Sequence, residues 1–138
     1  MSAENKAILK RIFEVMGQGD LNDLDEMIVS DVIDHNPDPG QTPGLAGVRQ
    51  AFTRFRAAFP DLSLTCEDIL AEGDKVAARI VMRGTNSGEF MGMPATGKQI
   101  AVNSIELARF ANGKVVERWG QFDAMGMMQQ LGVAPMPE

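Results

Sequence analysis

The 138-residue sequence contains one cysteine, one histidine and one tryptophan, and it has no tyrosine. The single cysteine, Cys66, excludes an intramolecular disulfide, and no Cys/His cluster has the spacing of metal ligands. The formal net charge is −6 and no run of Lys or Arg is present, so a nucleic-acid surface is not expected. No apolar stretch approaches the length of a membrane span.

The remaining composition is ordinary for a globular protein, with 44% apolar and 23% charged residues. The length predicts one domain, residues 1–138, with a core that needs no metal or disulfide. The first 16 residues carry charges throughout and lack the apolar core of a signal peptide. We therefore expect a cytoplasmic protein.

The first half of the chain shows the apolar spacing of three helices. Ser2 is placed to cap the first helix, within residues 1–20, and glycines 17 and 19 end it. Asp20 can cap a short second helix whose inner face is predicted to extend to Ile28. Residues 31–44 contain three prolines and are predicted to be irregular after a short extended start. The third helix ends at Pro60 and has an apolar face formed by Val48, Phe52, Phe55 and Phe59.

The second half alternates with a period of two, which predicts strands. Strands are expected at residues 62–71, 75–85, 89–91, 100–110 and 114–122. Asn112-Gly113 is a hairpin signal between the last two. A final helix runs from Asp123 to Gly132, and residues 133–138 are expected to form a loose tail. Helices followed by strands predict an α+β fold with helices packed on one face of a curved, mainly antiparallel sheet.

The end of the last strand is the strongest candidate site. Alternation places Glu117, Trp119, Gln121 and Asp123 on one face. If that face points towards the helices, Asp123 enters an apolar cavity as a candidate general base, and Trp119 and Gln121 can hold a carbonyl oxygen. The alternative is that Asp123 only caps the final helix, which periodicity alone favours.

Other candidates are weaker. His35 and Asn36 close a short extended segment beside Pro37, and each has a structural alternative as a loop hydrogen-bonding residue. Asn103 lies on a strand whose alternation does not reveal which face is buried. Flexible methionines such as Met91 and Met127 suit an adaptable apolar pocket, although core packing is the commoner reason for methionine.

Four segments together resemble the SnoaL-like polyketide cyclases, also called ester cyclases, of the nuclear-transport-factor-like superfamily. They are HNP, FTRFRAAFPDL, GTNSGEFMGMPATGK and ERWGQFDAMGMMQQLG, and the resemblance extends from about Leu24 to Gly132. It implies a single SnoaL-like domain shaped as a cone, in which a strongly curved sheet surrounds a deep apolar pocket. It also implies a homodimer or tetramer formed through the outer sheet face.

The resemblance implies ring closure of an apolar aromatic ester by intramolecular aldol condensation, without metal or organic cofactor. In the family an aspartate near the end of the last strand removes the proton between the ester and the aromatic system, and the matching residue here is Asp123. The expected substrate-binding residues are His35, Asn36, Trp119, Gln121, Asn103, Phe52, Phe55, Met91 and Met127.

The missing residue types disfavour other reactions known on this fold. Ketosteroid isomerase and scytalone dehydratase share the fold but use tyrosines, which this chain lacks, and limonene epoxide hydrolase uses an Arg-x-Asp pair that no strand carries. A non-catalytic module that binds a hydrophobic small molecule is the alternative to a cyclase.

Overall fold

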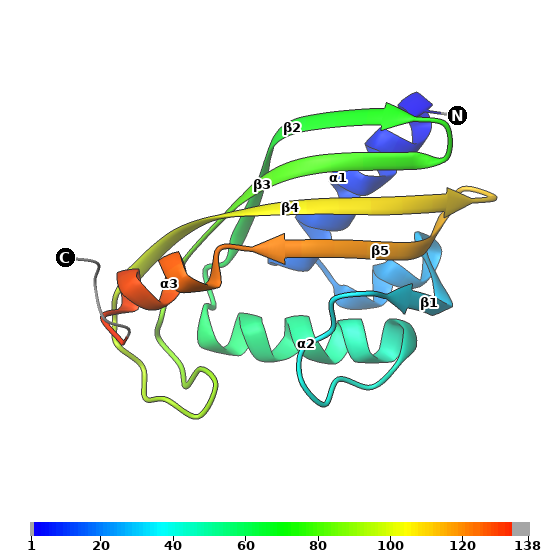
Figure 1. The fold of residues 1–138 in the computed structure, drawn as a ribbon. Coiled ribbons are helices and arrows are strands. Elements are labelled where there is room, and N and C mark those ends of the chain that lie inside the picture. Colours follow the sequence, from blue (N-terminus) through cyan, green and yellow to red (C-terminus); the bar gives the residue numbers. More distant parts are fainter. Residues whose placement is uncertain (1, 134–138) are drawn as a thin grey trace.

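The computed structural model describes residues 2–133, so the predicted tail lies outside the described residues except for Val133. Helix α1 (Ser2–Gln18) is followed by the 3₁₀ helix η1 (Leu21–Glu26), β1 (Ile28–Asp34) and α2 (Gly44–Ala58). Four strands and a helix complete the chain (Figure 1): β2 (Ser63–Glu72), β3 (Lys75–Thr85), β4 (Gln99–Ala111), β5 (Lys114–Phe122) and α3 (Ala124–Leu131).

The five strands form one mixed sheet in the order β1-β5-β4-β3-β2. Three neighbouring pairs are antiparallel, while β1 runs parallel to β5. The sheet curves around α1 and α2 without closing (Figure 1), because β1 and β2 are its two edges. The predicted α+β fold with a mainly antiparallel sheet is confirmed.

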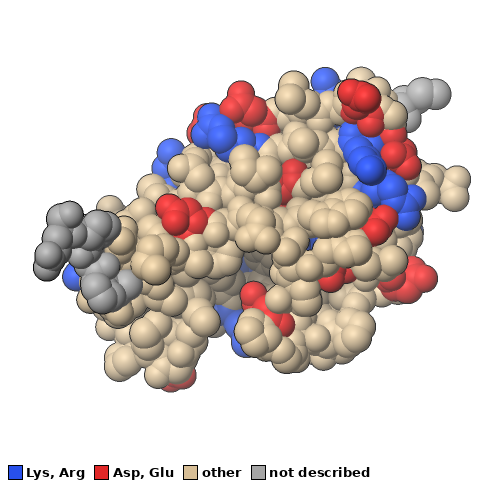
Figure 2. Space-filling model, viewed as in Figure 1, with Lys and Arg blue, Asp and Glu red and all other residues tan. Residues whose placement is uncertain are grey.

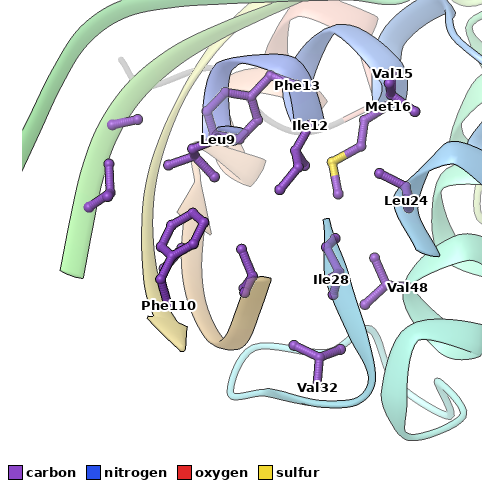
Figure 3. Close-up of a cluster of buried hydrophobic side chains, with 14 of the residues drawn as sticks. Leu9, Ile12, Phe13, Val15, Met16, Leu24, Ile28, Val32, Val48 and Phe110 are labelled. Atoms are coloured by element: carbon purple, nitrogen blue, oxygen red, sulfur yellow. The ribbon is translucent and has the colours of Figure 1, made fainter. Parts of the chain in front are cut away.

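The main core lies between α1, α2 and the concave face of the sheet. Helix α1 directs Leu9, Ile12 and Phe13 towards Phe110 of β4 and Ile28 of β1 (Figure 3). Burial of each such side chain contributes roughly 1.5–3 kcal/mol, so this face fixes α1 on the sheet. The alternation predicted for β3 is confirmed, because the four apolar residues of one face are buried: Val76, Ala78, Ile80 and Met82.

A second buried cluster joins the end of α2 to α3. Met127 of α3 is fully buried there, together with Phe59 and Leu62 after α2 and Val102 of β4. Phe90 packs edge-on against the ring of Phe59, with ring centroids 5.4 Å apart. This cluster closes the end of the sheet beyond the tip of β5.

Two sequence predictions of secondary structure were wrong. The short second helix ends at Glu26 rather than extending to Ile28, since Ile28 begins β1 and pairs with Val115. The strand predicted at 89–91 is absent, and only a single bridge joins Phe90 and Met93. The loop is instead fastened by the buried side chain of Asn86, which accepts hydrogen bonds from the backbone and hydroxyl of Thr96 at 2.9 Å.

The register of β4 and β5 decides which residues face the helices. Ser104 is buried and lies opposite Phe122, and Glu106 lies opposite Gly120. The next residue on β4, Ile105, is exposed. The concave face therefore carries the even-numbered residues over 100–110 of β4 and 118–122 of β5, while the register shift between Arg109 and Phe110 brings the buried Val115 to the same face. Among the described residues, no helix is long and apolar enough to cross a membrane.

Candidate active-site pocket

A pocket lies between α2 and the concave face of the sheet, and Figure 2 shows a recess there with acidic and basic atoms around it. Its empty space, which includes the part open to solvent, is about 660 Å³. Its wall combines apolar side chains (Val48, Ala51, Phe52, Phe55, Met82 and Phe122) with polar ones (Asp34, Asn36, Asp38, Gln41, Ser104, Glu106 and Arg118).

The floor of the pocket carries three charged side chains, Asp34, Glu106 and Arg118, which we call the triad. Arg118 donates from Nη1 to Oδ1 of Asp34 and from Nη2 to Oε2 of Glu106, each at 2.6 Å. The side chains of Arg118, Glu106 and Asp34 are only 23%, 19% and 7% exposed. Neighbouring strands position them, since β1 and β4 flank β5. Arg118 thus bridges two largely buried carboxylates.

The surroundings of the triad alter its protonation. Burial raises the pKa of the Glu106 carboxyl, and the negative charge of Asp34 adds to this effect, while Arg118 and Ser104 act in the opposite direction. Burial alone would lower the pKa of Arg118, but the two carboxylates outweigh it and raise that pKa. Arg118 therefore stays charged, and burial favours the protonated form of Glu106.

Gly120 makes room for this arrangement. A Cβ atom at position 120 would collide with Nη2 of Arg118 and Oε2 of Glu106. The Gly120 N–H donates to Oδ1 of Asn36 at 2.9 Å, which holds the segment after β1 against β5. The absence of a side chain at Gly120 lets the Glu106–Arg118 ion pair occupy the space in front of β5.

A second, more apolar cavity lies behind the triad, beneath α1, and its empty space, including any part open to solvent, is about 530 Å³. It is lined by Leu9, Ile12, Phe13 and other core residues. Both cavities share five lining residues: Phe52, Met82, Ser104, Glu106 and Arg118. The triad thus lies between an opening to solvent and an apolar interior, where a ligand can bury apolar surface while it contacts a carboxylate.

Three of the predicted substrate-binding residues line the pocket. Phe52 and Phe55 lie on the inward face of α2, with ring centroids 6.5 Å apart. Asn36 lines the opposite side. The helical spacing that predicted an apolar face on α2 therefore located one wall of the pocket.

Four other predicted residues lie on the convex face of the sheet. His35 stacks on Trp119 with ring centroids 4.6 Å apart, and its Nε2 is 2.7 Å from Oε2 of Glu117. Gln121 lies opposite the exposed Ile105, and Asn103 accepts a long hydrogen bond from Arg79. The face of β5 that sequence reasoning singled out therefore points away from the helices, because the core selects the alternate residues.

Asp123, Met91 and Met127 lie elsewhere. Asp123 is the N-cap of α3, and its Oδ1 accepts the Gly126 N–H at 2.8 Å. It is exposed and follows Phe122, the last residue of β5 on the pocket wall. Met91 is exposed on the loop before β4, and Met127 belongs to the second core cluster. The structure brings none of the three into the pocket wall.

Sequence reasoning missed Asp34, Glu106 and Arg118 as site residues. A signal for Glu106 was available, because it falls in phase with three apolar residues of the same predicted strand, Val102, Ala108 and Phe110. A charged side chain on the buried face of a strand requires a hydrogen-bonding partner of opposite charge. The partners could not be read from the sequence, since Arg118 and Asp34 are separated by 84 positions. In residues 2–133, no three His, Cys, Asp or Glu side chains are grouped so that they could hold a metal ion.

Together the open, curved sheet and the helices on its concave side match the α+β fold of the nuclear-transport-factor type. The sequence profile of the SnoaL-like polyketide cyclases matches residues 6–131. The chain belongs to this family.

Curated relatives and solved structures support the assignment. The chain is 30% identical to the aklanonic acid methyl ester cyclase DauD of Streptomyces sp. (strain C5), over 95% of this chain and 84% of that protein. It is also 30% identical to the nogalonic acid methyl ester cyclase of Streptomyces nogalater, over 87% and 90% of the two chains. TsrD from Streptomyces laurentii superposes with a TM-score of 0.87 at 30% identity, with 96% and 97% covered. IdmH from Streptomyces antibioticus gives 0.82 at 36% identity, with 94% and 99% covered.

Proposed function

We propose that the protein is a cofactor-independent cyclase that closes a ring on an apolar aromatic ester by proton abstraction and intramolecular aldol addition. The observation that carries this proposal is the pocket itself: its walls are aromatic and aliphatic, and its floor holds two carboxylates on one guanidinium. The names of the relatives, which are methyl ester cyclases, favour the same class of substrate.

The chemistry requires little from the protein. The carbon between an ester and an aromatic ring is acidic because both groups delocalise the charge of the enolate. A positioned carboxylate is then a sufficient base and typically accelerates proton transfer by about 10²–10⁴-fold. Asp123, the base predicted from the sequence, remains a prediction. Its place at the N-terminus of α3 would require the substrate to extend to the mouth of the pocket.

Deuterium exchange tests whether the pocket performs this chemistry. The probe is an anthraquinone that carries a methyl acetate ester and, on the neighbouring ring carbon, a ketone side chain. We expect the protein in D₂O to speed deuterium entry into the acetate methylene, followed by mass spectrometry. Ala51→Trp, which fills the pocket from α2, should abolish this acceleration. Gln50→Trp introduces the same side chain at the exposed neighbouring position and should leave it intact.

The alternative function, a module that binds a hydrophobic molecule without acting on it, predicts a different outcome. The probe would bind, and binding would be blocked by Ala51→Trp. Deuterium entry into the bound probe would then equal the rate without protein. That result would refute the proposed cyclase activity for this class of ester.

A further inference from the structure

The triad contains one cation for two carboxylates. With both carboxylates ionised, the formal charge of Asp34, Arg118 and Glu106 is −1. A net charge in a largely buried site is unfavourable, and uptake of one proton removes it. The triad is thus arranged to hold one exchangeable proton at the boundary between the two cavities.

Asp34 is poorly suited to carry that proton, because its carboxylate is fully engaged as an acceptor. Oδ1 accepts from Arg118 and, at 3.0 Å, from the Asn36 N–H, and Oδ2 accepts from Nε2 of Gln41 at 3.1 Å. Arg118 contacts Glu106 through Oε2 only, so the guanidinium does not occupy both oxygens of this carboxylate.

We propose that Glu106 is the carboxylate that takes the proton from the bound ester and returns it to the product, with Arg118 and Asp34 as positioning residues. This inference rests on the proposed cyclase function and identifies its acid–base group.

The proposed step balances without an external reactant. Glu106 removes a proton from the carbon between the ester and the ring, and the electron pair of that C–H bond forms the new C–C bond to the ketone carbon. The π electrons of the ketone move to its oxygen, which takes the proton from Glu106. Glu106 is then a carboxylate again, and the product is a β-hydroxy ester.

The surroundings of Glu106 support this role. The other described charged groups that line either cavity are Asp34, Asp38 and Arg118, while α1 and α2 contribute apolar side chains. Burial, with Asp34, raises the pKa of Glu106, which makes its carboxylate a stronger base than an exposed glutamate. When Glu106 is protonated, Asp34 and Arg118 remain as a neutral pair beside it.

The deuterium-exchange assay with the same anthraquinone probe tests the assignment. We expect Glu106→Gln to lower protein-catalysed exchange by about 10²–10⁴-fold. Glu67→Gln, an isosteric change at an exposed glutamate, should leave it within about twofold. Exchange that persists in Glu106→Gln but is lost in Asp123→Asn would overturn the assignment and favour Asp123. Absence of exchange in the unaltered protein would refute the cyclase function and this inference with it.

A second variant covers the case in which Glu106→Gln does not fold. Asp34→Asn keeps Glu106 but removes the negative charge that raises its pKa. In a plot of exchange rate against pH, the rate falls on the acid side as Glu106 becomes protonated. We expect this fall to occur at lower pH in Asp34→Asn, because Glu106 then ionises more easily. A role for Asp34 in structure alone would lower the rate without moving this fall. A fall at unchanged pH would overturn the proposal.

Discussion

Replacement of Arg118 by methionine is the most informative single change, because it removes the one cation of the triad. The carboxylates of Asp34 and Glu106 would then share a site that is mostly closed to water. Loss of one partner from a buried ion pair typically costs about 3–5 kcal/mol. The two charge-assisted hydrogen bonds at 2.6 Å give a similar figure, since each contributes about 1.5–3 kcal/mol. We therefore expect Arg118→Met to lower the free energy of unfolding by about 3–5 kcal/mol at pH 7.

Urea unfolding followed by far-ultraviolet circular dichroism measures this cost from the midpoint, provided that the slope is unchanged. A triple variant that combines Asp34→Asn, Glu106→Gln and Arg118→Met is the control. It removes every charge of the triad, and we expect it to regain most of the lost stability, because no buried charge is left unpaired. The cost of Arg118→Met should also be smaller at pH 5 than at pH 7, since two facing carboxylates readily take up a proton.

Three results would contradict this reasoning. The first is a loss below about 1 kcal/mol in Arg118→Met, which would resemble an exposed ion pair. The second is an equal loss at both pH values, which would attribute the effect to packing of the arginine stem rather than to charge. The third is a triple variant as unstable as the single one.

The other predictions concern pH, packing, capping and assembly. Since the pKa of Glu106 is raised above 4.5, the folded protein keeps a proton that the unfolded chain has released. The contribution of Glu106 to the free energy of unfolding is therefore full below pH 4.5. It is lost as the pH rises through the pKa of Glu106 in the folded protein. Glu106→Gln should flatten this decline in urea unfolding, and an unchanged slope would contradict it. Met127→Ala should cost about 2–5 kcal/mol through a cavity in the second core cluster. Met125→Ala on the same helix, at a residue 62% exposed, should cost under about 0.5 kcal/mol. Equal losses of stability in the two variants would contradict the buried packing of Met127. Asp123→Ala should cost about 0.5–2 kcal/mol through loss of the cap of α3, whereas Asp123→Asn should cost little, and the same denaturation assay distinguishes them. We propose that the convex sheet face joins copies of the chain. Ile105→Arg, at a residue 54% exposed there, should then lower the mass measured by sedimentation, while Thr53→Arg on the exposed side of α2 should not. An unchanged mass in Ile105→Arg would count against this interface.

The sequence predicted most of the fold because its elements carry strong local signals. The apolar spacing of α1 and α2, the alternation of β3 and the Asn112-Gly113 turn each depend on residues within a few positions of one another. The failures fell where a long-range partner decides the conformation. Ile28 has the pattern of a helix residue, yet pairing with Val115 makes it the start of β1. The segment around Phe90 has the pattern of a strand, yet Asn86 fastens it as a loop.

The site was less predictable, and the reason is again physical. Alternation along β5 separates two faces correctly, but it does not reveal which face the helices cover. That choice depends on the summed apolar area of the whole sheet and its helices, and it placed Arg118, Gly120 and Phe122 inside and Trp119 and Gln121 outside.

Local sequence was thus sufficient for the elements, the fold class and the resemblance to a family, because each is written in short-range spacing and in motifs. Tertiary structure alone decided which strand face is concave. It also joined Asp34 to Arg118 and Glu106, and it enclosed one guanidinium and two carboxylates where water is scarce. Proton transfer depends on such burial and pairing between distant positions, and neither is a property of any short stretch of the chain.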